Sequence, residues 1–187
     1  MNRRVPLSPR GPAPVSGNYF YPLGSGATGT NTLPNGFLYV VPWELGAATT
    51  LTRLGIDVST VGEAGSKVRL GIYADTGNWY PGSLVLDAGQ LLGDSATMQE
   101  LTISQALTAG TYWLGAVGQS ATTTPPTIRV AASYTPRWPI GVGTSLPGAN
   151  ATWASYVHTG VTAALPATFT STVAANPRAP RFVAKAA

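Results

Sequence analysis

The chain of 187 residues contains no cysteine and only one histidine, His158. The absence of cysteine excludes disulfide bonds, thiolate catalysis and the zinc or iron–sulfur sites that thiolates build. Any catalytic triad or histidine metal site would have to be built around His158, with carboxylates in support. A single histidine in the run YVHTG is more typical of an ordinary surface or edge-strand residue, so we expect no such site.

Charge is also scarce, since only 10% of the residues are charged, and it is unevenly placed. Arg3, Arg4 and Arg10 make the first ten residues basic, and no acidic residue follows Glu100. Such basic ends suit an acidic protein surface or a nucleic acid. Because the chain lacks a Lys/Arg cluster and an RNA-binding aromatic motif, we expect no specific nucleic-acid partner.

Long apolar runs are missing as well. The basic N-terminal stretch lacks the apolar central run of a secretory signal, so we expect no signal peptide. No segment approaches the roughly 18 consecutive apolar residues that cross a bilayer. We therefore expect a soluble protein with no membrane span.

Short apolar runs separated by Gly, Pro, Ser, Thr and Ala fill the middle of the chain. Alternating or continuous apolar runs of this length, with turn residues between them, are typical of β-strands. Seven strands at short and fairly even spacing indicate an all-β fold, an antiparallel β-sandwich or jelly roll. The predicted strands are residues 36–45, 50–60, 66–75, 83–92, 98–107, 111–120 and 127–133.

The third predicted strand shows how we expect each strand to divide its side chains. Val68, Leu70 and Ile72 alternate with Arg69 and Tyr73. Successive side chains of a strand point to opposite faces of the sheet. We therefore expect Val68, Leu70 and Ile72 to face the core, and Arg69 and Tyr73 to face water.

The run RLGI occurs twice, at residues 53–56 and 69–72. Nothing after the two runs continues the similarity, and a repeat array needs a longer period. We interpret them as strand sequences that are alike by convergence.

The two ends of the chain differ from the middle. Residues 1–35 hold several prolines but few periodic apolar positions, which indicates an extended Pro/Gly-rich arm. We expect this arm to dock on a partner and residues 36–187 to form the sandwich domain. Within the Pro- and Gly-rich segment 134–187, VHTGVTAALPATF and RFVAKAA retain enough apolar residues to return as edge strands. We expect this segment to wrap around the sandwich.

One stretch, GSGATG at residues 24–29, matches the GxGxxG pattern of dinucleotide-binding loops. That pattern binds a pyrophosphate only between a strand and the N-terminus of a helix. Here TNTLPNG follows, and Pro34 would stop a young helix. The stretch is better explained as a flexible loop, and we expect no cofactor.

The acidic residues permit two chemistries that need only carboxylates. A glycosidase could use a pair of them, and a calcium loop could form around Asp75, Asn78 and Asp87. Three spaced oxygens are few for calcium, and most of the acids stand beside turns, where Asp caps backbone N–H groups. We expect no enzyme and no metal site. The seven acids are Glu44, Asp57, Glu63, Asp75, Asp87, Asp94 and Glu100.

The run TGNWYPG at residues 76–82 is predicted to connect two strands, with Pro81 and Gly82 in the turn. Trp79 and Tyr80 then lie at the loop. Exposed aromatic rings can stack on a sugar or on a partner surface, whereas rings folded back would cap the core. If the flanking strands keep their alternation, at least one ring points outward.

The runs LTRLGIDVSTVGEAGSKVRLGIYADTGNWYPGSLVLDAG, TISQALTAGTYWLGAVGQ and GVTAALPATF resemble a domain of virion proteins of tailed bacteriophages. The family consists chiefly of minor tail and fibre-type proteins, and the resemblance covers about residues 17–175. It implies a β-sandwich at the periphery of the particle, commonly trimeric, with no catalytic residues to carry over. Unlike long fibre proteins, this chain is short and has no collagen-like or coiled-coil stalk, which leaves open a tail or a capsid position.

The resulting expectation is a non-enzymatic structural protein of a virion, assembled in the host cytoplasm. It would join other virion proteins and contact a glycan of the host cell envelope. A capsid decoration protein is the first alternative, and a free carbohydrate-binding module is the second. A virion part should need its arm to join particles, whereas a free module should bind glycan without it.

Overall fold

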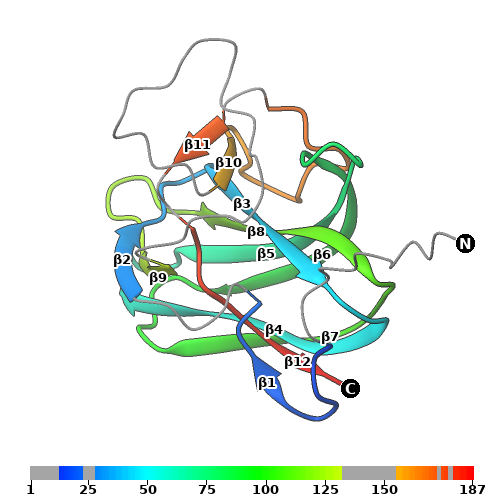
Figure 1. Cartoon of the computed structure of the whole chain (residues 1–187). Helices are drawn as coiled ribbons and strands as arrows, with labels where there is room; N and C mark the ends of the chain where they lie inside the picture. Colours follow the sequence, from blue (N-terminus) through cyan, green and yellow to red (C-terminus); the bar gives the residue numbers. More distant parts are fainter. Residues whose placement is uncertain (1–12, 23–27, 132–154, 172–173, 177–178) are drawn as a thin grey trace, which may run out of the picture.

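A computed structural model describes residues 13–22, 28–131, 155–171, 174–176 and 179–187. Within these ranges the chain forms strands joined by turns and loops, with no helix and hence no helix able to cross a membrane. The strands form two six-stranded sheets that stack face to face (Figure 1). Every pairing between the named strands is antiparallel. The predicted all-β, antiparallel β-sandwich is confirmed.

Sheet I has the strand order β1-β12-β4-β9-β2, and β7 also pairs with β4. The long strand β4 is its centre, because it pairs with β12, β9 and β7. The strands of sheet I are β1 (Tyr19–Phe20), β2 (Thr28–Thr32), β4 (Thr49–Thr60), β7 (Met98–Leu107), β9 (Thr127–Ala131) and β12 (Phe182–Ala186).

Sheet II has the strand order β11-β10-β3-β8-β5-β6. The β3–β8 and β8–β5 pairs keep a regular register over their whole length. The strands of sheet II are β3 (Leu38–Leu45), β5 (Lys67–Asp75), β6 (Pro81–Leu92), β8 (Gly110–Gln119), β10 (Ser155–His158) and β11 (Ala174–Asn176).

The seven strands predicted between residues 36 and 133 correspond to β3 through β9, and the ends that lie among the described residues agree to within two residues. Their inward side chains meet in one core between the sheets. Leu54 and Ile56 of β4 lie there with Leu70 and Ile72 of β5, and all four are fully buried. Burying a side chain of this size contributes about 1.5–3 kcal/mol, so this core accounts for much of the stability.

Residues 159–171, which we call the strap, cover the outer face of sheet II (Figure 1). Val161, Leu165 and Phe169 of the strap are buried in a second apolar cluster, against Tyr73 of β5 and Trp113 of β8. This explains why β3 and β8 are buried almost without interruption. Where the strap lies, sheet II is therefore covered on both faces.

Hydrogen bonds fix the strap along its length. The Gln119 amide donates to the carbonyls of Val161 and Ala163 at 3.1 and 2.6 Å. The Asp87 carboxylate accepts the backbone N–H of Leu165 at 3.0 Å. The Tyr73 hydroxyl donates to the carbonyl of Pro166 at 3.1 Å. These bonds satisfy backbone groups that would otherwise be buried without partners.

The strap corrects the prediction that Tyr73 faces water. Tyr73 does point away from the sandwich core, as the alternation requires, yet it is 0% exposed because the strap covers it. Burial and the nearby Asp87 raise the pKa of its hydroxyl. Arg69, on the same face, is also partly buried. The alternation predicted the direction of these side chains but not what lies over them.

Part of the predicted arm, residues 1–35, lies within sheet I. β1 pairs with β12, and β2 pairs with β9 along its full length. Leu33, just after β2, is buried in the main core. Arg3, Arg4 and Arg10 lie outside the described residues.

The two C-terminal segments predicted as edge strands do not form them: RFVAKAA contains β12, and VHTGVTAALPATF contributes only its first two residues to β10 and otherwise forms the strap. β12 lies between β1 and β4, and β10 lies between β3 and β11. The expectation of edge strands is wrong here because short flanking strands, β1 and β11, pair with the outer sides of both.

Candidate functional site

The loop between β5 and β6 is a tight turn held by its own hydrogen bonds. Asp75 Oδ2 accepts the backbone N–H of Gly77 at 2.7 Å, which confirms that Asp75 caps a turn. The N–H of Thr76 donates to the carbonyl of Tyr80 at 2.9 Å. Trp79 has a φ of 56°, a left-handed conformation that is uncommon for a bulky residue. The turn thus holds Trp79 in a strained backbone conformation.

This turn does not include Pro81 and Gly82, contrary to the prediction. Pro81 pairs with Asp75 and begins β6. Proline is compatible with the first residue of an edge strand, because no ladder hydrogen bond is lost there. β6 is the edge of sheet II, so the Pro-Gly pair starts the strand and the turn precedes it.

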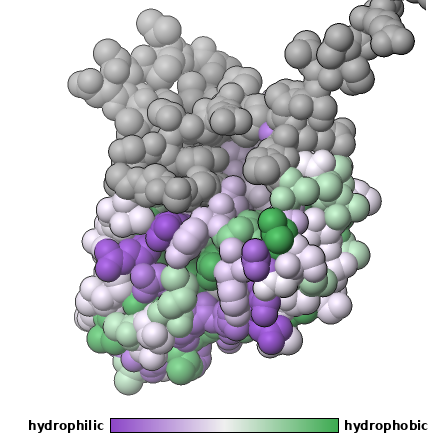
Figure 2. Space-filling model, turned by 60° about the horizontal axis from the view of Figure 1, so that its bottom comes forward, coloured by the Kyte–Doolittle hydropathy of each residue, from purple (hydrophilic) through white to green (hydrophobic). Residues whose placement is uncertain are grey.

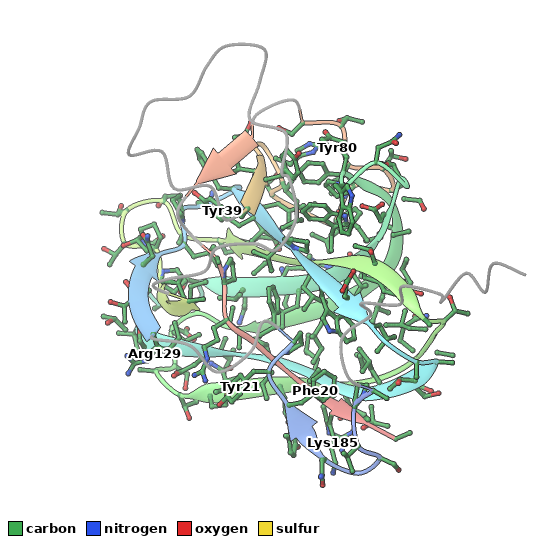
Figure 3. The ribbon with its side chains drawn as sticks, in the orientation of Figure 1. Phe20, Tyr21, Tyr39, Tyr80, Arg129 and Lys185 are labelled. Atoms are coloured by element: carbon green, nitrogen blue, oxygen red, sulfur yellow. The ribbon has the colours of Figure 1, made fainter. Side chains whose placement is uncertain are left out.

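Tyr80 points into the molecule (Figure 3). Its ring packs edge-on against Tyr156 and Phe169, with centroids 5.1 and 5.8 Å apart. Its hydroxyl donates to the carbonyl of Ser171 at the end of the strap, and burial raises its pKa. Of the two alternatives given by the sequence, the structure therefore shows that Tyr80 folds back and caps the interior.

Trp79, in contrast, lines a pocket of about 400 Å³ at the end of sheet II. We call it the tip pocket. None of its described lining residues belongs to the strap. The residues that line it are Glu44, Asp75, Gly77, Trp79, Gly110 and Thr111.

Three adjacent strands supply the polar side chains of the tip pocket. Glu44 of β3 pairs with Thr111 of β8. The β5–β8 register pairs Ala74 with Tyr112, which places Asp75 beside Thr111. Neighbouring strands lie about 4.8 Å apart, so these three side chains form a row across the sheet. The row faces outward because Tyr112, one position along, packs against the core.

The tip pocket presents mainly hydrogen-bond acceptors. Asp75 is held in place, since its Oδ1 accepts the indole N–H of Trp113 at 2.8 Å while its Oδ2 accepts Gly77. A carboxylate engaged in this way serves as a fixed acceptor. Glu44 adds a second carboxylate, and Thr111 adds a hydroxyl that donates or accepts. The tip pocket thus combines two carboxylates, a hydroxyl group and one aromatic side chain among its described residues.

Neither the calcium loop nor a histidine site is assembled in the described part of the chain, whereas one pair of the predicted acids, Glu44 and Asp75, meets in the tip pocket. Asp87 is paired with Arg69 at 2.8 Å, under the strap, rather than with Asp75 and Asn78. No group of three or more acidic or histidine side chains there could hold a metal ion. The ring of His158 packs against Phe169, and its buried Nδ1 has no hydrogen-bond partner among these residues. A catalytic histidine needs a partner that orients this nitrogen.

A second polar surface occupies the outer face of sheet I, and sequence reasoning missed it. We call it the basic face. Arg129 lies between the buried Ile128 and Val130, and Lys185 lies between the buried Ala184 and Ala186, so strand alternation could have placed these two cations outward. The order of the strands, which brings them together, is not visible in the sequence. The basic face comprises Arg53, Arg129, Arg181 and Lys185, with Tyr19, Tyr21, Asp57 and Glu100 among them.

The basic face is organised by contacts between its cations and its tyrosines. The guanidinium of Arg181 lies 3.7 Å from the ring centroid of Tyr21, and the ammonium of Lys185 lies 5.1 Å from that of Tyr19. The hydroxyl of Tyr19 donates to Glu100, which also pairs with Arg53 at 3.2 Å. Figure 2 looks toward this side of the sandwich and shows hydrophilic residues interspersed with apolar ones.

Comparisons with models of protein families, with curated proteins and with solved structures found no match.

Proposed function

We propose that the chain is a non-enzymatic structural protein of a tailed-bacteriophage virion, a peripheral minor tail or fibre-type part that acts in assembly and host attachment. One observation supports it best. The basic face and the tip pocket lie on the two opposite outer faces of one sandwich. In Figure 3, Tyr80, next to the pocket residue Trp79, lies at the top, and Lys185 lies at the bottom.

Such an arrangement suits a part that docks with one side and presents the other. The basic face carries four cations and two carboxylates, so it complements an acidic surface of a neighbouring virion protein. Arg3, Arg4 and Arg10 add charge of the same sign to the segment that leads into β1. The tip pocket then faces away from the particle, toward the host envelope.

The resemblance to tailed-phage proteins supports the same role and adds a trimer. Several copies on one particle would strengthen weak contacts with a cell surface by multivalency. Light scattering checks the oligomer. The proposal expects three times the chain mass of 19.3 kDa, and a monomer at micromolar concentration would contradict a trimer that forms by itself.

The experiment that tests the role uses purified particles of the phage that encodes the chain. Mass spectrometry should find the chain in the particles, and gold-labelled antibody should mark the tail. Label over the capsid would instead support a decoration protein. Absence from particles would overturn the proposal. If the secreted or free protein then bound glycan, it would be a free carbohydrate-binding module.

A second arm of that experiment tests docking through the basic end. Particles assembled with a chain that lacks residues 1–12 and carries Arg181→Ser and Lys185→Ser should contain little of it. A normal complement would contradict docking by this face.

A further inference from the structure

We propose that the basic face binds an extended acidic segment of a partner protein through Arg181 and Lys185. The segment carries two carboxylates four residues apart, with a neutral residue midway between them. This inference names the partner chemistry of the docking surface, and in its biological meaning it rests on the proposed function. Its chemistry rests on the contacts of β12 with its neighbours.

β12 and the residue before it place two cations on the same outer side of sheet I. Phe182 and Ala184 are fully buried in the main core, so the residues that alternate with them point outward. These residues are Arg181, Val183 and Lys185. A strand rises about 3.3 Å per residue, so the two cationic positions lie about 13 Å apart along the chain. They form the two ends of a short row whose middle residue is apolar.

The acidic side chains of the chain leave both cations available. All seven acidic residues lie in the described part of the chain. The ion pairs that they form there are with Arg53, Arg69 and Arg129. In that part of the chain no acidic side chain pairs with Arg181 or Lys185, so these two cations keep their charge for a ligand.

Two tyrosines hold the available cations in position. The guanidinium of Arg181 lies 3.7 Å from the ring centroid of Tyr21, and the ammonium of Lys185 lies 5.1 Å from that of Tyr19. Tyr21 and Lys185 both lie at the bottom of Figure 3, on the sheet I side of the sandwich. Both side chains have lost part of their freedom before a ligand arrives, which reduces the ordering cost of binding.

The donors of these cations suit carboxylates. The Nε of Arg181 is buried, so a ligand meets the two terminal nitrogens of the guanidinium. These nitrogens form a planar fork that matches the two oxygens of a carboxylate. The ammonium of Lys185 binds a second carboxylate as a point charge. An extended segment with acids four residues apart has the same spacing of about 13 Å.

A second copy of the chain is a poor source of these carboxylates. Each of its acidic side chains already has an interaction within its own chain. Docking any of them on another copy would compete with that interaction. A different protein with accessible acids fits the surplus of positive charge better.

A uniform polyanion fits less well than a spaced acidic segment. The basic face also contains Asp57, paired with Arg129, and Glu100, paired with Arg53. A polymer with a negative charge on every unit would place some of its charges near these carboxylates, and like charges at close range are disfavoured. A segment with a neutral middle residue avoids this and meets Val183 between the two cations.

The test is a titration of the isotope-labelled full chain, followed by NMR at low ionic strength, with two synthetic peptides of equal composition and blocked ends. One carries two aspartates four residues apart among serines and threonines, and the other carries the same aspartates side by side. The spaced peptide should shift the amide signals of Arg181, Val183 and Lys185 and bind severalfold more tightly. No shift at millimolar peptide, or equal affinity for the two peptides, would overturn the proposal.

A third titration uses inorganic polyphosphate. The proposal expects it to bind these residues more weakly than the spaced peptide at equal concentration of negative charge. Tighter binding would overturn the proposal and identify the basic face as a site for polyanions.

Variants test which cations bind the peptide. Arg181→Ser and Lys185→Ser should each weaken binding about fivefold, and the double variant should abolish it. Lys67→Ser is the matched control, because Lys67 precedes the buried Val68 and so points to the outer face of sheet II. Binding that survives the double variant in a well-dispersed, folded spectrum would contradict the site. An equal loss with Lys67→Ser would contradict it as well.

Failure of this inference and failure of the proposed function look different. Binding of the spaced peptide by a chain that is absent from particles would leave the chemistry of the basic face intact and overturn the virion role. A chain that is found on the tail but binds neither peptide would do the reverse.

Discussion

The same four residues, Arg-Leu-Gly-Ile, occur in β4 of sheet I and in β5 of sheet II, and their two settings differ only on the outside. In both copies the Leu and the Ile are fully buried in the shared core. In both copies the Arg forms an ion pair with an acid on the neighbouring strand of its sheet: Arg53 with Glu100 of β7, and Arg69 with Asp87 of β6. Arg53 and Glu100 remain 33% and 38% exposed, whereas Arg69 and Asp87 are 19% and 23% exposed.

The glycines of the two copies show the same difference between the outer face of sheet I and the strap-covered outer face of sheet II. A Cβ at Gly55 would collide with the backbone carbonyl of Gln99 on the paired strand β7. A Cβ at Gly71 would collide with Leu165 of the strap as well as with the carbonyl of Leu86. Local alternation thus determines what points inward, and a segment distant in sequence determines what happens to the outer side.

The largest expected loss of stability comes from a change in the strap. Phe169→Ala removes a ring that is 2% exposed and packs on Tyr73 and Tyr80. We expect a loss of about 3–5 kcal/mol in the free energy of unfolding, as for other buried aromatic residues. Met98→Ala, on the open face of sheet I, should cost less than about 0.5 kcal/mol. Denaturant unfolding checks both, and equal losses would mean that the strap is not part of the core.

The two arginines provide the next comparison. Arg69→Ala leaves Asp87 partly buried without its cation and also removes a bond to Gln119. We expect the free energy of unfolding to fall by about 2–3 kcal/mol, less than for a fully buried pair that loses one partner. Arg53→Ala breaks an exposed pair and should cost less than about 1 kcal/mol. If the two variants unfold at the same denaturant concentration, the distinction between the faces fails.

Two hydroxyl groups sharpen the comparison further. Tyr80→Phe deletes the bond to the Ser171 carbonyl that ties down the end of the strap, and should cost about 1 kcal/mol. Tyr19→Phe deletes a bond to Glu100 on the open face, and we expect no measurable change. Thermal unfolding of the two variants checks this prediction. A larger drop in melting temperature for Tyr19→Phe than for Tyr80→Phe would contradict it.

The smallest expected change in stability concerns Glu63, which lies in a loop between β4 and β5. Backbone N–H groups of Thr122, Thr124 and Thr123 donate to the Glu63 carboxylate and lower its pKa from the ordinary value of 4.5. A carboxyl whose pKa is lower in the folded state contributes stability above its unfolded pKa and loses it as pH falls through the folded pKa. Wild type should therefore lose more stability than Glu63→Gln as pH falls below 4.5. Parallel pH profiles for the two proteins would contradict this assignment.

The comparison of the two sheets also explains which parts of the fold could be predicted from the sequence. Period-two alternation and turn residues predicted β3 through β9 because both are local signals. They did not predict that β2 joins β9 or that the strap covers Tyr73, because both are contacts between residues distant in sequence.

The site divides in the same way. The sequence singled out Trp79 and Tyr80 as neighbours on a loop. The structure places Trp79 at the tip pocket and Tyr80 against the strap. Glu44 and Thr111 could not be joined to Trp79 beforehand, because only the β3–β8–β5 strand order brings them together.

The most direct test of the account is to measure adsorption of whole particles that carry Trp79→Gly or Tyr80→Ala, together with the melting temperature of each purified variant. Trp79→Gly should melt within about 2 °C of the wild type and reduce adsorption severalfold, because the proposed function assigns the ring to a contact surface. Tyr80→Ala should melt about 4–10 °C lower, yet its particles should adsorb normally at a temperature where it is folded. Normal adsorption with Trp79→Gly, or an adsorption defect with folded Tyr80→Ala, would contradict the division of the two aromatics on which the account depends.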